Sequence, residues 1–167
     1  RDQLGLDAES KRLVEKYYTD FIRSGANLSN EEKESLKKIN GEMAVLQTTF
    51  SQNVLKEVNA LAVVVDFKNE LDGLSDAAIE AAANEAKSRE LDGKYVLTLR
   101  NTSGQPPIAS LTNRALRERI HKTSLSRGSR GGDYDNRDVL ANIIKLRAER
   151  AQLMGYDNHA AYSLENQ

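Results

Sequence analysis

Apolar residues recur at steps of three and four over most of the chain, which is the spacing of an amphipathic helix. The first such run predicts a helix from about residue 7 to residue 24, closed by Gly25 in the left-handed conformation that follows many helices. A second run follows Ser29 and Glu32, the signature of a capping box, and predicts a helix of about 30 residues. The two helices are expected to form an antiparallel hairpin. Their apolar positions are Leu13, Val14, Tyr17, Tyr18, Phe21 and Ile22 in the first, and Leu36, Ile39, Met43, Leu46, Phe50 and Val54 in the second.

The pattern then changes to that of short strands. Residues 61–65 and 95–99 are rich in β-branched and aromatic side chains and are too short for a helix. They predict two strands, over about 61–66 and 94–100, paired in a small ribbon. Between them, Ser75 is expected to cap an alanine-rich helix. The inner face of that helix carries Ile79, Ala82, Ala83 and Ala86.

The next segment predicts a loop and then a helix. Residues 101–107 have the composition of a loop, whose end Pro106 and Pro107 are expected to hold extended. A helix is expected from about residue 110 to residue 126. Residues 127–132 follow as a flexible, glycine-rich turn.

The last third predicts two more helices. Asp135 is expected to cap a helix that ends at Gly155, and its apolar positions are Val139, Leu140, Ile143, Leu146, Ala151 and Leu153. Another helix is expected to start at Asp157, and the chain stops inside it at Gln167. Together with a start at Arg1, this favours a segment cut from a longer protein; a short docked terminal helix is the alternative.

Composition agrees with a mainly α fold, in which the hairpin and further helices pack together with the short ribbon. Only 2 prolines interrupt the chain and aromatic residues are 5% of it. The 167 residues fit one domain, so residues 1–167 are interpreted as a single helical segment.

The charges nearly cancel, with 24 basic and 25 acidic residues and a net charge of -1. No overall field attracts nucleic acid or an anionic membrane, and no apolar run approaches the roughly 18–20 residues of a membrane span. Neither is therefore expected as a partner. The absence of cysteine excludes disulfides and thiolate metal sites, but it does not separate a cytoplasmic protein from a periplasmic or exported one.

Two histidines are the first candidates for chemistry. Glu118 and His121 have the Glu-x-x-His spacing that di-iron helical bundles use, but those bundles need two such motifs and two further glutamates. His159 lacks the matching glutamate, because Tyr156 stands in its place. A surface or partly buried histidine is therefore the interpretation of His121, and a residue at a helix start that of His159.

The glycine-rich turn at residues 127–132 is the second candidate, as a phosphate cradle or a nucleic-acid contact. It lacks the Gly-Lys-Ser/Thr of a P-loop, no strand precedes it, and Tyr134 is the one aromatic beside it. A solvated turn is favoured, and the nearby basic cluster can equally face an acidic partner. That cluster is Arg114, Arg117, Arg119, Lys122, Arg127 and Arg130. No serine lies in a Gly-x-Ser-x-Gly elbow, so the sequence assigns no catalytic, cofactor-binding or metal-binding residue.

Several stretches together resemble the thimet-oligopeptidase-like family of zinc metallopeptidases, and within it the bacterial peptidyl-dipeptidases, or dipeptidyl carboxypeptidases. The stretches lie at residues 21–28, 39–40, 50–53, 71–75 (LDGLS), 91–99 (LDGKYVLTL), 101–102, 105–107, 113–118, 146–151, 153–156 and 162–164. Each is weak by itself, and their order and spacing give the resemblance its specificity.

This resemblance implies a mostly helical peptidase in which two halves enclose a deep channel. It implies zinc on a His-Glu-x-x-His helix with a later glutamate, and release of dipeptides from the C-termini of short peptides. The chain has no such motif, so no catalytic residue is carried over and zinc is expected only in the parent protein. The expected partner is the remainder of the same polypeptide, which holds the catalytic domain, with short peptides as the parent's substrates.

Two functions follow as hypotheses. In the first, the chain is a scaffold and channel-wall segment of a zinc peptidyl-dipeptidase. In the second, it is a free-standing helical protein-interaction module without enzymatic activity. A truncated segment is expected to expose apolar surface, whereas a free-standing module is expected to tolerate the end at Gln167.

Overall fold

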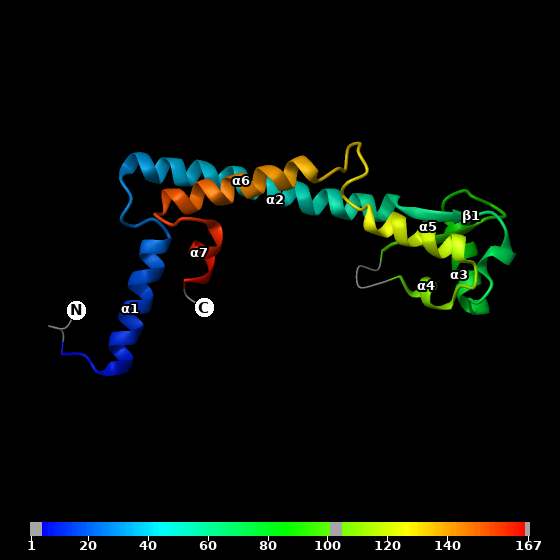
Figure 1. Cartoon of the computed structure of the whole chain (residues 1–167), viewed down its shortest axis with the longest axis horizontal. Coiled ribbons are helices and arrows are strands. Elements are labelled where there is room, and N and C mark those ends of the chain that lie inside the picture. Colours follow the sequence, from blue (N-terminus) through cyan, green and yellow to red (C-terminus); the bar gives the residue numbers. More distant parts are fainter. Residues whose placement is uncertain (1–4, 101–104, 166–167) are drawn as a thin grey trace. The chain divides into compact units, whose positions relative to one another are not determined.

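A computed structural model describes residues 5–100 and 105–165 of the chain. The chain divides into two compact units, residues 1–47 with 140–167 and residues 48–139. We call them unit 1 and unit 2 and describe each by itself. The divisions fall inside two helices, α2 (Asn30–Ala60) and α6 (Arg137–Leu153), which are labelled with the other elements in Figure 1.

Unit 1 contains α1 (Ala8–Arg23), the first half of α2, most of α6 and α7 (His159–Leu164). Its buried apolar side chains come from α2 and α6. They are Leu36, Met43, Ile143, Leu146 and Ala151. These residues occupy the helical spacing that predicted both helices, so the core of unit 1 lies on the faces of α2 and α6 that the sequence indicated.

The turn between α1 and α2 forms as predicted. Gly25 has φ +97°, and the amides of Gly25 and Ala26 donate to the carbonyls of Ile22 and Phe21 at 2.9 and 3.0 Å. This is the Schellman pattern that closes a helix. The predicted capping box of α2 is also present, because the Glu32 amide donates to Ser29 Oγ and the Ser29 amide donates to the Glu32 carboxylate.

The two helices of the expected hairpin occupy the predicted residues, but they do not pack face to face. None of the side chains of α1 is buried, and five of its large apolar residues are between 39% and 65% exposed. Figure 1 shows α1 running across the direction of α2 rather than along it. The last turn of α1 is held instead by the hydrogen bonds of Arg23 to Tyr162 and Glu165.

Unit 2 is built around the predicted ribbon. Strand β1 (Ala62–Val65) pairs antiparallel with β2 (Tyr95–Thr98), so that Ala62 lies opposite Thr98 and Val65 opposite Tyr95. Helix α3 (Asp76–Ser88) is capped as predicted by Ser75, whose Oγ accepts from the Ala78 amide at 3.3 Å. The core of unit 2 comprises Leu61, Val63, Val65, Leu71, Ala82, Leu97, Leu99, Leu111, Leu116 and Ile120.

A close backbone approach fixes the segment after the short 3-10 helix η2 (Lys68–Leu71). A Cβ on Gly73 would lie 2.1 Å from the carbonyl oxygen of Ser110, and Gly73 has φ +93°. Beside it, the Thr112 amide donates to the Asp72 carbonyl at 2.9 Å and the Thr112 hydroxyl donates to the Asp72 carboxylate at 3.0 Å. Only glycine fits here, because both the space and the backbone conformation exclude a side chain.

The helix predicted from residue 110 to 126 begins later than expected. Pro106 and Pro107 open a short helix, α4 (Pro106–Ser110), instead of holding the chain extended, since the fixed φ of proline suits the first helical turn. Helix α5 (Arg114–Leu125) then starts at its own cap, Asn113, which accepts from the Leu116 amide at 3.1 Å. The rest of the predicted loop, residues 101–104, lies outside the described residues.

The last two helices agree with the sequence except at one cap. Asp135 accepts from the first amide of α6, that of Arg137, at 2.9 Å, and α6 closes on Gly155 at φ +81°. Helix α7, however, is capped by Asn158 rather than by Asp157, because the side chain of Asn158 is the one that reaches the Ala161 amide, at 2.9 Å. His159 is the first residue of α7, as the sequence indicated.

Candidate functional site

Glu118 and His121 both lie on α5. Glu118 bonds Lys122 at 2.5 Å, and this contact lowers the pKa of the Glu118 carboxyl. His121 is exposed on the same helix. Within residues 5–100 and 105–165, no three acidic or histidine side chains gather in a way that suits a metal ion.

His159 lies in a setting that opposes metal binding. Its Nδ1 is buried with no hydrogen-bond partner in the described part of the chain, and its Nε2 lies 3.3 Å from Ser163 Oγ. Burial lowers the pKa of His159, and the positive charges of Arg147 and Arg150 lower it further. Those charges disfavour any added cation, whether a proton or a metal ion.

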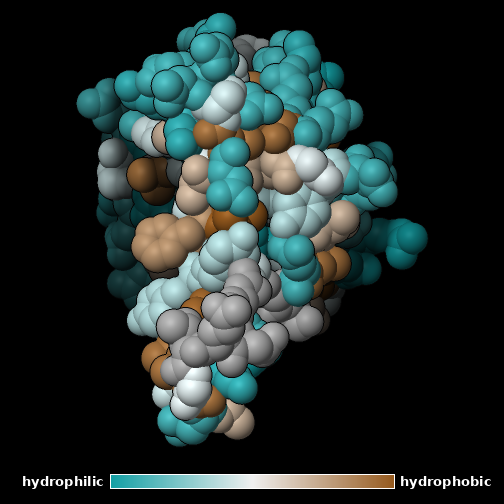
Figure 2. Space-filling model, turned by 90° about the vertical axis from the view of Figure 1, so that its left-hand side faces the viewer, coloured by the Kyte–Doolittle hydropathy of each residue, from teal (hydrophilic) through white to brown (hydrophobic). Residues whose placement is uncertain are grey.

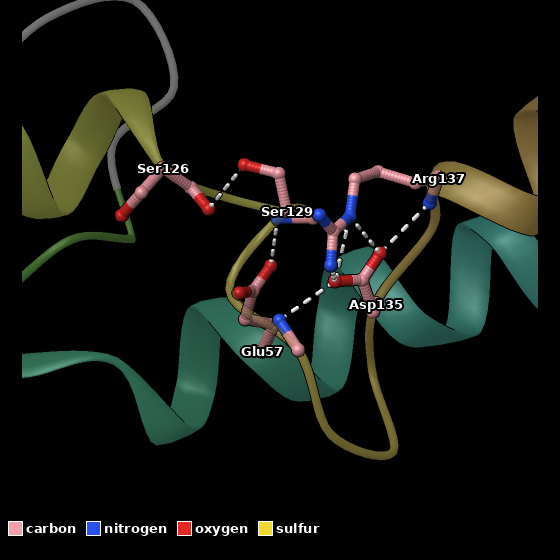
Figure 3. A network of polar contacts seen from close by, with 7 residues as sticks. Glu57, Ser126, Ser129, Asp135 and Arg137 are labelled. Carbon is pink, nitrogen blue, oxygen red and sulfur yellow. Dashed lines mark hydrogen bonds and ion pairs between the residues drawn. The ribbon is translucent and has the colours of Figure 1, made fainter.

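The glycine-rich turn at residues 127–132 is occupied by the protein's own carboxylates (Figure 3). The Gly128 amide donates to the buried Glu57 of α2, and the Gly131 amide donates to Asp135 at 2.7 Å. Asp135 also binds the Arg137 guanidinium at 2.7 Å, which holds the pKa of the Asp135 carboxyl well below its usual range. Because acidic side chains take these amides, the turn does not present a phosphate cradle.

Most members of the basic cluster are likewise engaged inside unit 2. The Arg119 guanidinium donates to the Val64 carbonyl at 2.6 Å, and that of Arg117 donates to the carbonyls of Leu111 and Thr112 at 2.7 and 2.9 Å. Arg127 donates to Ser124, and Lys122 is paired with Glu118. The contacts of Arg117 and Arg119 fasten α5 to neighbouring backbone, whereas those of Lys122 and Arg127 are local to α5 and its C-terminal end.

A cluster that the sequence did not indicate joins the end of α1 to α7 in unit 1. The Arg23 guanidinium donates to the Glu165 carboxylate at 2.6 Å and to the Tyr162 carbonyl at 2.5 Å, and the Tyr162 hydroxyl donates back to the Arg23 carbonyl at 3.1 Å. The Tyr156 hydroxyl also donates to Glu165, which raises the pKa of Tyr156. No spacing rule predicts this cluster, because its partners are 139 and 142 residues apart.

Beside this cluster lies an open depression of about 380 Å³. Its lining combines charged and polar side chains from α1, α2, α6 and α7, namely Asp20, Arg23, Ser24, Leu36, Asn40, Arg150 and Tyr162. The Tyr162 ring lies 4.7 Å from the Arg23 guanidinium carbon and 5.2 Å from that of Arg150. Two arginines and an aromatic ring therefore line this depression.

None of the helices in the part of the chain that the structure describes is both long and apolar enough to cross a membrane.

Comparison with known proteins identifies similar peptidases. The profile of Peptidase family M3 matches residues 108–167. The chain is 35% identical over 167 residues to dipeptidyl carboxypeptidase of Escherichia coli, covering 100% of this chain and 24% of that protein. Oligopeptidase A of Escherichia coli is 34% identical over 163 residues, which is 95% of this chain and 24% of the relative. An organellar oligopeptidase A of Arabidopsis thaliana is 34% identical over 169 residues, which cover 98% of this chain and 21% of that protein.

The chain belongs to the thimet-oligopeptidase-like family of metallopeptidases, the Peptidase family M3. It spans about a quarter of the length of the curated relatives it matches. The identity extends over both units, so the resemblance carried by the short motifs reflects a relationship along the whole chain.

Proposed function

We propose that the chain is a non-catalytic part of a zinc-dependent peptidyl-dipeptidase, which removes dipeptides from the C-termini of short peptides. In this role it contributes to the scaffold and to the wall of the substrate channel. Its partner is the remainder of the same polypeptide. The observation that carries the proposal is the 35% identity along all 167 residues with two dipeptidyl carboxypeptidases.

The side chains of this chain indicate which part of the proposed enzyme would hold the zinc ion. The sequence has no His-Glu-x-x-His motif, and its described acids and histidines do not fit a zinc site. Zinc and its activated water therefore belong to the remainder of the polypeptide, and no step of the zinc reaction is assigned to this chain. Its helices supply rigid surfaces, which suits a wall rather than a reaction centre.

A second candidate is a free-standing helical interaction module, and the exposed apolar face of α1 favours it. Five large apolar side chains on one helix are more than a solvated surface helix usually shows. A segment that normally packs against the rest of its own polypeptide would expose the same kind of apolar face. The mass of the native polypeptide separates the two.

The first test is that mass, measured in source cells with an antibody raised against this chain. A band several times larger than 18.6 kDa supports the proposal, whereas a band at 18.6 kDa favours the free-standing module.

The long polypeptide is then assayed on a blocked peptide, with products identified by mass spectrometry. Sequential release of C-terminal dipeptides that stops on zinc removal supports the specificity. Cleavage at internal bonds instead points to an oligopeptidase.

A further inference from the structure

Arg150 is a partly buried cation with no counter-charge among the residues of unit 1 that the structure describes. Its Nε is buried with no acceptor among the described residues, and no described carboxylate lies within ion-pair distance of its guanidinium. The Tyr162 ring packs against it at 5.2 Å, which holds the guanidinium in place. An unpaired charge that has lost part of its hydration is costly, so the site favours a group that supplies an acceptor.

The charges around the depression specify the kind of group. Arg23 is already paired with Glu165, and Asp20 with Lys16 at 3.4 Å. Arg150 is therefore the one lining cation that remains uncompensated among the described residues. A carboxylate, with a single negative charge and two acceptor oxygens, matches one guanidinium, whereas a dianionic phosphate would leave excess negative charge beside Asp20.

The surroundings indicate a protein partner rather than a small ligand. A second hollow, of about 520 Å³, adjoins the first and shares Ser24, Leu36 and Asn40 with it. Phe21, which is 65% exposed, belongs both to this hollow and to the apolar face of α1. Figure 2 shows hydrophobic residues lying among hydrophilic ones on this end of the structure. The second hollow also carries Lys33 and Lys37 on its lining, so the surface combines apolar area with positive charge, as protein interfaces that bind an acidic partner do.

We propose that this surface docks a segment of the remainder of the polypeptide that carries an aspartate or glutamate next to apolar side chains. The carboxylate binds Arg150 in the depression, and the apolar side chains cover the face of α1 around Phe21. This inference rests on the proposed function, because it requires more of the same polypeptide than the present chain.

The first experiment places a photo-crosslinking amino acid at position 21 of the long polypeptide. Mass spectrometry of the product is expected to show a crosslink to a segment outside residues 1–167, with an acidic residue next to it. A matched control at position 125 in unit 2, where Leu125 is 71% exposed, should not yield that product. A crosslink only to a second copy, only to other proteins, or only within residues 1–167 would overturn the inference.

The second experiment reverses charge at the depression. Arg150→Glu in the long polypeptide should speed proteolysis within α1 by about tenfold, because two carboxylates then face each other at the docked surface. Arg147→Glu makes the same charge change on α6 outside the depression and should have a much smaller effect. Replacing the crosslinked acid by arginine should restore resistance to Arg150→Glu. Equal effects of the two variants, or no rescue, would contradict the docking.

The outcomes separate this inference from the proposed function. A native band at 18.6 kDa overturns both, since no remainder would then exist. A long, active polypeptide whose position 21 does not crosslink outside residues 1–167 overturns the docking alone.

Discussion

The tripeptide Leu-Asp-Gly occurs twice in unit 2, at residues 71–73 and 91–93, and the two glycines are constrained differently. Both have positive φ, +93° at Gly73 and +79° at Gly93. A Cβ on Gly73 would meet the Ser110 carbonyl at 2.1 Å, whereas one on Gly93 would meet nothing within 4 Å. The pair therefore separates the cost of the backbone conformation from the cost of a steric overlap.

Gly93→Ala is expected to lower the free energy of unfolding by about 1–2 kcal/mol, the cost of a left-handed alanine. Gly73→Ala should cost several kcal/mol more than this, because residues 110–112 must move and the bonds from Thr112 to Asp72 are then strained. Urea denaturation of both variants measures the difference. Equal losses would mean that the approach of Gly73 to Ser110 is not a fixed feature of unit 2.

His159 gives a prediction about pH. Burial and the charges of Arg147 and Arg150 lower its pKa below 6.5, so the unfolded chain binds a proton at a higher pH than the folded chain does. The free energy of unfolding should therefore fall as the pH drops from about 7.5 through about 6.5, and His159 should contribute no slope above that range.

Unfolding titrations of His159→Gln across that range provide the measurement. The variant should lose most of the slope, while His121→Gln, at an exposed position of α5, should retain it. A slope that survives in His159→Gln would place the titrating group elsewhere.

At the scale of elements, the 126–136 connection is held to α2 by a buried polar network. Glu57 accepts from the Gly128 amide, and Asn136 binds the Asn53 amide and the Phe50 carbonyl at 3.1 Å each. Asn136 and Glu57 are both buried. The segment that the sequence predicted as a flexible turn therefore has fixed partners on α2, which no local spacing could indicate.

Glu57→Leu should release this connection, since the Gly128 amide then loses its acceptor at a buried position, at a cost of about 1–3 kcal/mol. Trypsin cleavage after Arg127 and Arg130 is expected to become about tenfold faster. Glu57→Gln keeps an acceptor oxygen at the same place and serves as the control. If both variants were cut at the same rate, the Glu57 contact would not be what holds the connection.

Element boundaries show where local sequence is sufficient. The capping box of α2 and the glycines that close α1 and α6 are predicted from the sequence, because each is a pattern of neighbouring residues that satisfies its own amides. The starts of α5 and α7 were misplaced by a few residues. In both cases an asparagine, Asn113 or Asn158, is the cap, and only its observed side-chain direction distinguishes it from nearby polar residues.

At the scale of the whole molecule, the apolar face of α1 is the feature that most needs a partner. Tyr17 and Phe21 are 58% and 65% exposed, and the hydrogen bonds of Arg23 to α7 hold only the last turn of the helix. Such a face is expected in a chain that aligns with a quarter of its relatives' length.

The purified chain is therefore expected to bind a hydrophobic dye such as ANS and to self-associate at high concentration. Replacing Tyr17 and Phe21 together by glutamine should reduce dye fluorescence at least about twofold and leave the unfolding midpoint nearly unchanged, because both side chains are exposed. Leu125→Gln, an exposed apolar position in unit 2, is the matched control. Undiminished fluorescence in the double variant would show that dye binds elsewhere.

The longer helices, the ribbon, the family and the absence of a zinc-peptidase motif can be read from the sequence, whereas α4 and the starts of α5 and α7 cannot. These features depend on hydrophobic periodicity, helix caps and the order of residues, all of which are present in the local sequence. Three features follow from the fold alone: α1 leaves its apolar face exposed, Glu57 holds the glycine-rich turn, and Arg150 has no counter-charge among the described residues. Each of these depends on contacts between residues far apart in the chain, and such contacts are set by how helices pack, which no spacing along the sequence specifies.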